Sequence, residues 1–180
     1  MDEDSIYKAL DLTMPWAVGL VITKRENKIN VCPVTFQVIS SIYEKPYVVC
    51  IGLSNTNYTL ETILKTKEFT YAYPSIKQLK DTLFSGTVSG RNMNKISKTS
   101  FEFTKASKIS SPHLNGAIVN FECKLDHAYR LERFTIVVGK IVHAQFDRYK
   151  KIEKLQKIYA LGDFDYGVIE KINVIQSSRT

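Results

Sequence analysis

The chain has few of the residues that build extended, cross-linked or membrane-spanning proteins. Its 180 residues include only 5 Pro and 8 Gly, which excludes collagen-like and linker-rich chains. Its 3 cysteines, Cys32, Cys50 and Cys123, are widely spaced and lack a C-x-x-C pair, which favours buried thiols over a disulfide framework or zinc site. The longest charge-free apolar stretch of the first half, Met14 to Ile22, is far shorter than the roughly 20 residues that span a bilayer.

Several catalytic signatures are also missing. The sequence contains no P-loop, no G-x-G-x-x-G, no H-E-x-x-H and no G-x-S-x-G motif. His113, His127 and His143 are too dispersed for a local metal motif, so we expect surface or hydrogen-bonded histidines. The acidic start, Asp2-Glu3-Asp4, is the opposite of a basic signal-peptide start. We therefore expect a cytoplasmic protein with no metal site, no catalytic triad and no membrane segment.

The composition is that of a globular protein with a basic balance. Hydrophobic residues make up 44% and charged residues 24%, and 9 Phe and 10 Tyr exclude intrinsic disorder. Basic residues outnumber acidic ones by 25 to 18, which favours nucleic acid, a membrane surface or a phosphorylated small molecule as partner. Because no repeat or linker is found, we expect one domain over 1–180, with a core at about 10–145 and a C-terminal helix and tail at 146–180.

Strand patterns dominate the chain, and short helical patterns interrupt them. Apolar and β-branched runs predict strands over 16–24, 29–31, 34–41, 47–53, 69–73, 117–125 and 133–145. Helical spacing predicts short helices over 58–65, 75–84 and 148–158, and residues 85–100 are predicted to form a loop. The run 47–53 is continuous enough for a strand covered on both faces, and Gly139 predicts a bulge or bend. Short helices inserted among about seven strands predict a mainly β fold, a β-barrel with short helical insertions.

Three polar segments interrupt this pattern and carry the candidate binding residues. The segment 30–35 lies at a strand junction, 54–59 precedes a predicted helix, and 89–95 lies in the predicted loop. Hydroxyl and amide side chains beside a helix N-terminus suit an anion, although from the chemistry alone a plain N-cap with a polar turn explains 54–59 somewhat better. In the third segment, Arg91 and Lys95 are either phosphate donors or part of a solvated loop.

The order of these segments resembles the flavin reductase-like proteins, the FMN-binding split β-barrels that include the flavoredoxins. No single motif is specific, but seven occur in the right order over about residues 10–145. The matching segments are Pro15 to Thr23, Asn30 to Thr35 (NVCPVT), Lys45-Pro46, Asn57 to Ile63 (NYTLETI), Lys67 to Pro74 (KEFTYAYP), Ser89 to Lys95 (SGRNMNK), and the pair Glu122-Cys123 with Val138 to Ile141.

The resemblance implies a flavoprotein oxidoreductase that transfers electrons or hydride through non-covalent FMN at the rim of the barrel. It implies a homodimer with the flavin near the subunit interface. The segment implied along the ribityl chain and ring comprises Asn30, Val31, Cys32, Pro33, Val34 and Thr35. The implied phosphate turn comprises Ser54, Asn55, Asn57, Tyr58 and Thr59, and the residues implied near the phosphate or a second substrate are Ser89, Arg91 and Lys95.

One departure from the family pattern leaves the electron donor open. Many members have Gly-Asp-His, with a histidine associated with pyridine nucleotides, where this chain has Glu132-Arg133-Phe134. Either NAD(P)H or a protein is therefore the electron donor, and a non-enzymatic FMN-binding electron carrier is an alternative. A basic β-barrel that binds single-stranded nucleic acid is disfavoured, because the basic residues concentrate on the predicted helix rather than on aromatic-bearing strands.

Overall fold

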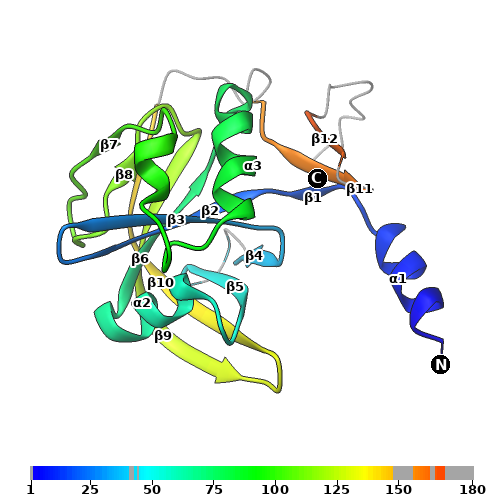
Figure 1. The fold of residues 1–180 in the computed structure, drawn as a ribbon. Coiled ribbons are helices and arrows are strands. Elements are labelled where there is room, and N and C mark those ends of the chain that lie inside the picture. The colour runs from blue at the N-terminus through cyan, green and yellow to red at the C-terminus, as the bar shows by residue number, and fades with distance from the viewer. Residues whose placement is uncertain (1, 41–42, 44, 148–155, 163–164, 169–180) are drawn as a thin grey trace, which may run out of the picture.

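Figure 1 shows the fold in a computed structural model, which describes residues 2–40, 43, 45–147, 156–162 and 165–168. Strands form the body of the molecule, and three short α-helices lie around them. Among the described residues, no helix has both the length and the apolar character needed to cross a membrane.

A seven-stranded antiparallel sheet forms the body, in the order β3-β2-β6-β9-β10-β5-β4. Its strands are β2 (Gly19–Arg25), β3 (Lys28–Val34), β4 (Gln37–Ile39), β5 (Val48–Ser54), β6 (Glu68–Tyr73), β9 (Val119–Arg130) and β10 (Phe134–Phe146). The two edge strands, β3 and β4, are joined only by Thr35 and Phe36. Because so short a link cannot cross a flat sheet of seven strands, the sheet curls until its edges approach. The predicted mainly β, split-barrel architecture is confirmed.

The inside of the curled sheet holds the main hydrophobic core. Large buried side chains include Ile51, Phe69 and Tyr71. The β5 run is fully buried on one face only, because Val49, Ile51 and Leu53 are buried while the alternate residues are half-buried. The predicted cover on both faces of this strand is therefore confirmed on one face and only partial on the other.

Gly139 lies where the register between β9 and β10 shifts, which confirms the predicted bulge. A Cβ atom at this position would overlap with the ring of Phe69. The glycine therefore allows a core aromatic ring to pack directly against the β10 backbone.

Two helices pack on the sheet and position the loops near the place where its edge strands, β3 and β4, approach each other. The helix α2 (Tyr58–Thr66) packs against β2 and β6, and α3 (Leu79–Thr87) follows the 3-10 turn η1 (Ile76–Gln78) and packs against β3. Both helices were predicted. The loop prediction over 85–100 is wrong in part, because α3 continues to Thr87 and η2 (Lys95–Lys98) is a further 3-10 turn. The Ser85 hydroxyl bonds back to the Thr82 carbonyl, so it supports the last helical turn instead of ending it.

The two ends of the chain build features outside the barrel. The helix α1 (Glu3–Asp11) has no buried residue and projects from the body (Figure 1). A small sheet joins β1 (Trp16–Ala17) to β11 (Tyr159–Gly162) and β12 (Asp165–Gly167), and β7 (Phe103–Thr104) pairs with β8 (His113–Leu114). The predicted helix over 148–158 lies largely outside the described residues. Its described end instead forms a β-bridge between Ser75 and Lys157.

Candidate functional site

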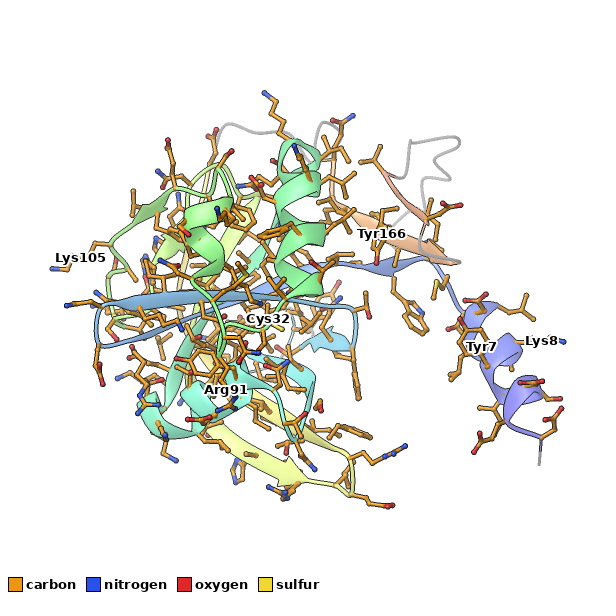
Figure 2. All side chains as sticks on the ribbon, viewed as in Figure 1. Tyr7, Lys8, Cys32, Arg91, Lys105 and Tyr166 are labelled. Carbon is orange, nitrogen blue, oxygen red and sulfur yellow. The ribbon has the colours of Figure 1, made fainter. Side chains whose placement is uncertain are left out.

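A polar cavity of about 420 Å³ lies at the start of α2, and the three polar segments of the sequence meet in its wall. Its wall residues are Asn30, Cys32 and Pro33 from β3; Ser54, Thr56, Asn57, Tyr58 and Thr59 from the turn into α2; and Ser85, Gly86, Thr87, Val88, Ser89, Gly90 and Lys95 from the end of α3 and the following loop. Figure 2 shows Cys32 near the centre of the molecule and Arg91 below it in that view. We call this space the polar cavity.

Side-chain hydrogen bonds fix the first turn of α2, which borders the polar cavity. The Asn57 carbonyl oxygen accepts a bond from the Thr59 N–H at 2.7 Å, so Asn57 is the N-cap. The Asn57 amide nitrogen points to the Cys32 sulfur at 3.5 Å. The Thr59 hydroxyl accepts a bond from the Asn30 amide at 2.8 Å, which leaves its own proton for donation to a ligand. The helix dipole adds positive potential at the same place.

A lysine ammonium is buried in the cavity wall. Lys95 is only 6% exposed, and its Nζ donates to the Val31 carbonyl at 2.9 Å and to the Ser85 carbonyl at 2.6 Å. Burial lowers the pKa of Lys95. Since an ammonium has three hydrogens and two are used by carbonyls, the third is available to an anion in the cavity.

An unpaired acceptor also lies in this wall. Asn30 is 3% exposed, and its side-chain oxygen has no hydrogen-bond partner. A buried polar atom without a partner costs about 1–3 kcal/mol. A ligand that brings hydroxyl or N–H donors into the polar cavity would remove this cost.

Cations surround Tyr58 at the rim of the polar cavity. The Lys28 ammonium lies 5.1 Å from the Tyr58 ring centroid, and the Arg91 guanidinium lies 5.6 Å from it. Arg91 also forms a 2.8 Å ion pair with Glu61, and bonds from Lys65 and Arg91 lower the pKa of the Glu61 carboxyl to about 2. Arg91 therefore lies at the rim and is engaged by Glu61, rather than lining the wall.

Some of the predicted residues lie elsewhere. The Asn55 amide donates to the carbonyls of Leu131 and Glu132 at 2.9 and 3.0 Å, and its oxygen accepts from the Thr135 hydroxyl at 2.7 Å. All of these partners belong to the β9–β10 hairpin, so Asn55 braces that hairpin outside the cavity wall. Val31 is fully buried in the core and contributes only its carbonyl.

A mostly apolar cavity of about 510 Å³ adjoins the polar one. It is lined by Val18, Pro33, Val34, Thr35, Thr82, Leu83, Gly86, Thr87 and Tyr166. Pro33, Gly86 and Thr87 belong to both walls, so the two cavities lie side by side along β3, and together we call them the trench. The predicted residues Val34 and Thr35 lie in this second part, which we call the apolar cavity.

The sequence did not reveal the contribution of α3 and the C-terminal strand. Residues 85–88 were read as part of a loop, and no structure was predicted for the tail that contains Tyr166. Thr82 is fully buried with an unpaired hydroxyl in the apolar wall, which the sequence alone cannot show. Within the described part of the chain, no group of three or more His, Cys, Asp or Glu side chains could hold a metal ion.

Known proteins resemble this chain in sequence or in structure. An uncharacterised protein of Archaeoglobus fulgidus is 28% identical over 138 residues, which cover 77% of this chain and 76% of that protein. The FMN-binding protein of Thermus thermophilus, solved with bound p-hydroxybenzaldehyde, is 18% identical, with a TM-score of 0.80 and 91% of each chain covered. Flavoredoxin of Methanosarcina acetivorans is 20% identical, with a TM-score of 0.78 and 91% and 89% of the two chains covered.

The sequence itself also matches a protein family over almost all of the described body. The match is to the flavin reductase like domain and extends over residues 12–165. This range contains every strand of the barrel, the whole wall of the polar cavity and the wall of the apolar cavity except Tyr166. The chain therefore belongs to the flavin reductase-like family.

Proposed function

We propose that this protein is a flavoprotein oxidoreductase that binds FMN without a covalent bond, in the trench along β3. The observation that carries the proposal is that a polar cavity and an apolar one lie side by side and share the wall residues Pro33, Gly86 and Thr87. FMN has the same two halves, a charged phosphate on a polar ribityl chain and a planar aromatic ring. The names of the Thermus FMN-binding protein and the Methanosarcina flavoredoxin support this choice of flavin.

The wall residues fit the polar half of FMN. The Thr59 hydroxyl, the start of α2 and the free hydrogen of Lys95 would hold the phosphate. The unpaired oxygen of Asn30 would accept a bond from a ribityl hydroxyl. Val34, Leu83 and Tyr166 supply apolar and aromatic surface for the ring.

The protein contributes binding and orientation rather than acid–base chemistry. A bound flavin carries the redox reactivity. Neither cavity wall contains a histidine or a carboxylate, so we assign no catalytic residue among them. Burial of the ring against Val34 and Leu83 would exclude water from one side of it.

A titration of flavin-free protein with FMN and with riboflavin tests this assignment. Quenching of flavin fluorescence should show that FMN binds more tightly than riboflavin, because only FMN carries the phosphate. Thr59→Val should weaken FMN binding by about 1–3 kcal/mol, the usual effect of losing a bond to a charged group, and should affect riboflavin less. Thr62→Val is the matched control, because Thr62 is also buried in α2 but does not line the polar cavity, and its hydroxyl donates to the Tyr58 carbonyl within the helix. Equal affinity for the two flavins, or no binding of either, would refute the proposal.

The electron donor is a finer question, and Phe134 favours a protein donor or a simple electron-carrier role. Its ring packs on Phe36 with centroids 5.6 Å apart, and Phe36 borders a third cavity of about 460 Å³ with Trp16 and Gln37. A phenyl ring cannot donate a hydrogen bond to a nicotinamide, which must stack within about 3–3.5 Å of the flavin for hydride transfer.

We therefore expect slow flavin reduction by NADH or NADPH and faster reduction by reduced ferredoxin or dithionite. Flavin bleaching in a stopped-flow instrument measures all four rates. The double change Arg133→Asp with Phe134→His should raise the nicotinamide-dependent rate without changing the rate with dithionite. Rapid wild-type turnover with either nucleotide would instead place the chain among the nucleotide-dependent flavin reductases.

A further inference from the structure

The three cysteines of the chain have different surroundings. Cys123 is fully buried, and burial raises the pKa of its thiol. Burial also raises the pKa of the Cys50 thiol. Neither residue lines either part of the trench. A thiol held in its protonated form is a weak nucleophile, so both positions favour an inert cysteine.

Cys32 is different because it belongs to the wall of the polar cavity. The Asn57 amide points at the sulfur from the α2 cap at 3.5 Å. The buried Lys95 ammonium belongs to the wall of the same cavity. Thiols in such partly exposed, electropositive surroundings are those that oxidants attack selectively.

The space in front of Cys32 is a ligand site on independent grounds. The side-chain oxygen of Asn30 is buried in the same wall and lacks a partner. The cavity of about 420 Å³ has room for a phosphate and part of a polar chain, and Cys32 is part of its wall. Any group added to the Cys32 sulfur would therefore compete with the ligand for this space.

We propose that Cys32 is a redox-sensitive modification site, and that its oxidation by a hydroperoxide weakens flavin binding. The inference rests on the proposed function. The sulfur attacks one oxygen of the peroxide, so that an S–O bond forms, the O–O bond breaks, and water or an alcohol leaves. The cysteine is oxidised to a sulfenic acid by two electrons, and the peroxide is reduced by two. Two external thiols reverse the step by way of a mixed disulfide and release the added oxygen as water.

The expected effect on binding follows from size and charge. The added oxygen projects into the polar cavity, where it displaces part of the ligand. In its ionised form it also places a negative charge beside the position proposed for the flavin phosphate. The Asn57 amide and the Lys95 ammonium would then bind the oxidised sulfur instead of the phosphate.

The test compares FMN affinity before and after brief treatment of the flavin-free protein with hydrogen peroxide. The wild-type dissociation constant should rise at least tenfold and return after dithiothreitol. Cys32→Ser should show the same affinity before and after treatment, whatever its starting value. Cys50→Ser is the matched control and should respond as the wild type does. An unchanged wild-type affinity after treatment, or an equal loss in Cys32→Ser, would overturn the inference.

A second measurement separates this inference from the proposed function. Iodoacetamide labelling of the untreated, flavin-free protein, followed by peptide mass mapping, should modify Cys32 well before Cys50 and Cys123. Labelling of Cys32 no faster than that of Cys50 would refute a reactive thiol while leaving FMN binding intact. Failure of the untreated protein to bind FMN would refute the proposed function, and the labelling rates would still decide whether Cys32 is reactive.

Discussion

At the scale of single residues, the wall of the polar cavity consists of side chains that are already fixed by other bonds. The Lys95 ammonium is held by two carbonyls, and the Asn57 amide is held by the Thr59 N–H. Ordering a flexible side chain on binding costs about 0.5–1.5 kcal/mol. Because these side chains are already ordered, the free energy of ligand binding is not reduced by that amount. The affinity of such a site depends on the shape of its wall as well as on its charges.

Gly90 tests this dependence on shape. A Cβ atom at this position would overlap with the side-chain oxygen of Asn30 and crowd the Tyr58 ring. We expect Gly90→Ala to displace Asn30 and weaken FMN binding about tenfold or more, which corresponds to about 1.4 kcal/mol. Fluorescence titration measures the change. Ser97→Ala is the control in the same loop, because its hydroxyl bonds only to the Asn94 carbonyl. Unchanged affinity in Gly90→Ala would show that Asn30 does not shape the site.

Glu122 is a buried carboxylate that fixes a long connection to the sheet. It is fully buried on β9 and accepts bonds from the N–H groups of Ser107 and Lys108 at 2.8 and 2.6 Å and from His113 at 2.8 Å. Burial alone would raise the pKa of Glu122, but these three donors lower it overall. His113 is thus the hydrogen-bonded histidine that the sequence predicted.

This arrangement makes the stability of the fold sensitive to acid. Since the folded-state pKa of Glu122 is lowered, its contribution is complete above the ordinary value of about 4.3 and is lost as the pH falls through the folded value. Glu122→Gln should lower the free energy of unfolding at neutral pH by about 3–5 kcal/mol and flatten its dependence on acid pH. Urea denaturation at several pH values measures both effects. Asp126→Asn is the control, because its pair with His127 is exposed and should contribute less than about 1 kcal/mol.

At the scale of elements, the β9–β10 hairpin is anchored beside the site by one side chain. Asn55 bonds to the carbonyls of Leu131 and Glu132 and to the Thr135 hydroxyl. Its neighbour Asn57 instead caps α2 and lines the polar cavity. The two asparagines therefore act on different elements although they are only two positions apart.

Exchanging each asparagine for alanine should separate these two roles. Asn55→Ala should lower the free energy of unfolding by about 1–3 kcal/mol and leave the FMN affinity of the folded protein nearly unchanged. Asn57→Ala should cost about 0.5–2 kcal/mol of stability and also weaken FMN binding. Chemical denaturation and flavin titration of both variants check the contrast. A large loss of FMN affinity in Asn55→Ala would instead show that Asn55 is part of the binding site.

Local pattern predicted the elements that are stabilised by near neighbours. The apolar and β-branched runs of β2 and β3 and the spacing of Leu60 and Ile63 in α2 are visible within a few residues, and those elements were predicted. The strand β11 was missed because its partner β1 lies far from it in the sequence, so no local pattern reveals the pairing. Sequence order likewise suggested that three polar segments meet, but only tertiary contacts show that Asn55 turns outward and that Lys95 is buried.

At the scale of the whole molecule, we propose that two copies associate through the edge of the sheet. Val38 on the edge strand β4 is 61% exposed, and Phe36, just before the strand, is half exposed. Apolar side chains on an edge strand are a surface that a second copy can cover. A homodimer formed there would place its interface near the trench, since Thr35, next to Phe36 in the link between β3 and β4, lines the apolar cavity.

Light scattering should therefore give the mass of a dimer for the wild type with FMN present. Val38→Glu should shift the protein toward the monomer, because a buried carboxylate without a partner opposes association. Leu64→Glu on α2 is the control, since it places the same charge on an exposed helix position. A wild-type mass of one chain would contradict the proposed dimer.

The pairing of β1 with β11 sets an order of events when the protein is made. Trp16 pairs with Ala160, and the Val18 N–H donates to the Ile158 carbonyl. β1 therefore cannot complete its pairing until residues 158–160 have been made. At about 5–20 residues per second, a ribosome takes on the order of ten seconds to travel between these positions. Throughout that interval the newly made chain lacks Tyr166 and hence one wall of the apolar cavity. The proposed flavin site is therefore incomplete until β11 and β12 have been made, and a nascent chain that stalls before β11 leaves Val18 without the Ile158 and Ala160 side chains that cover it.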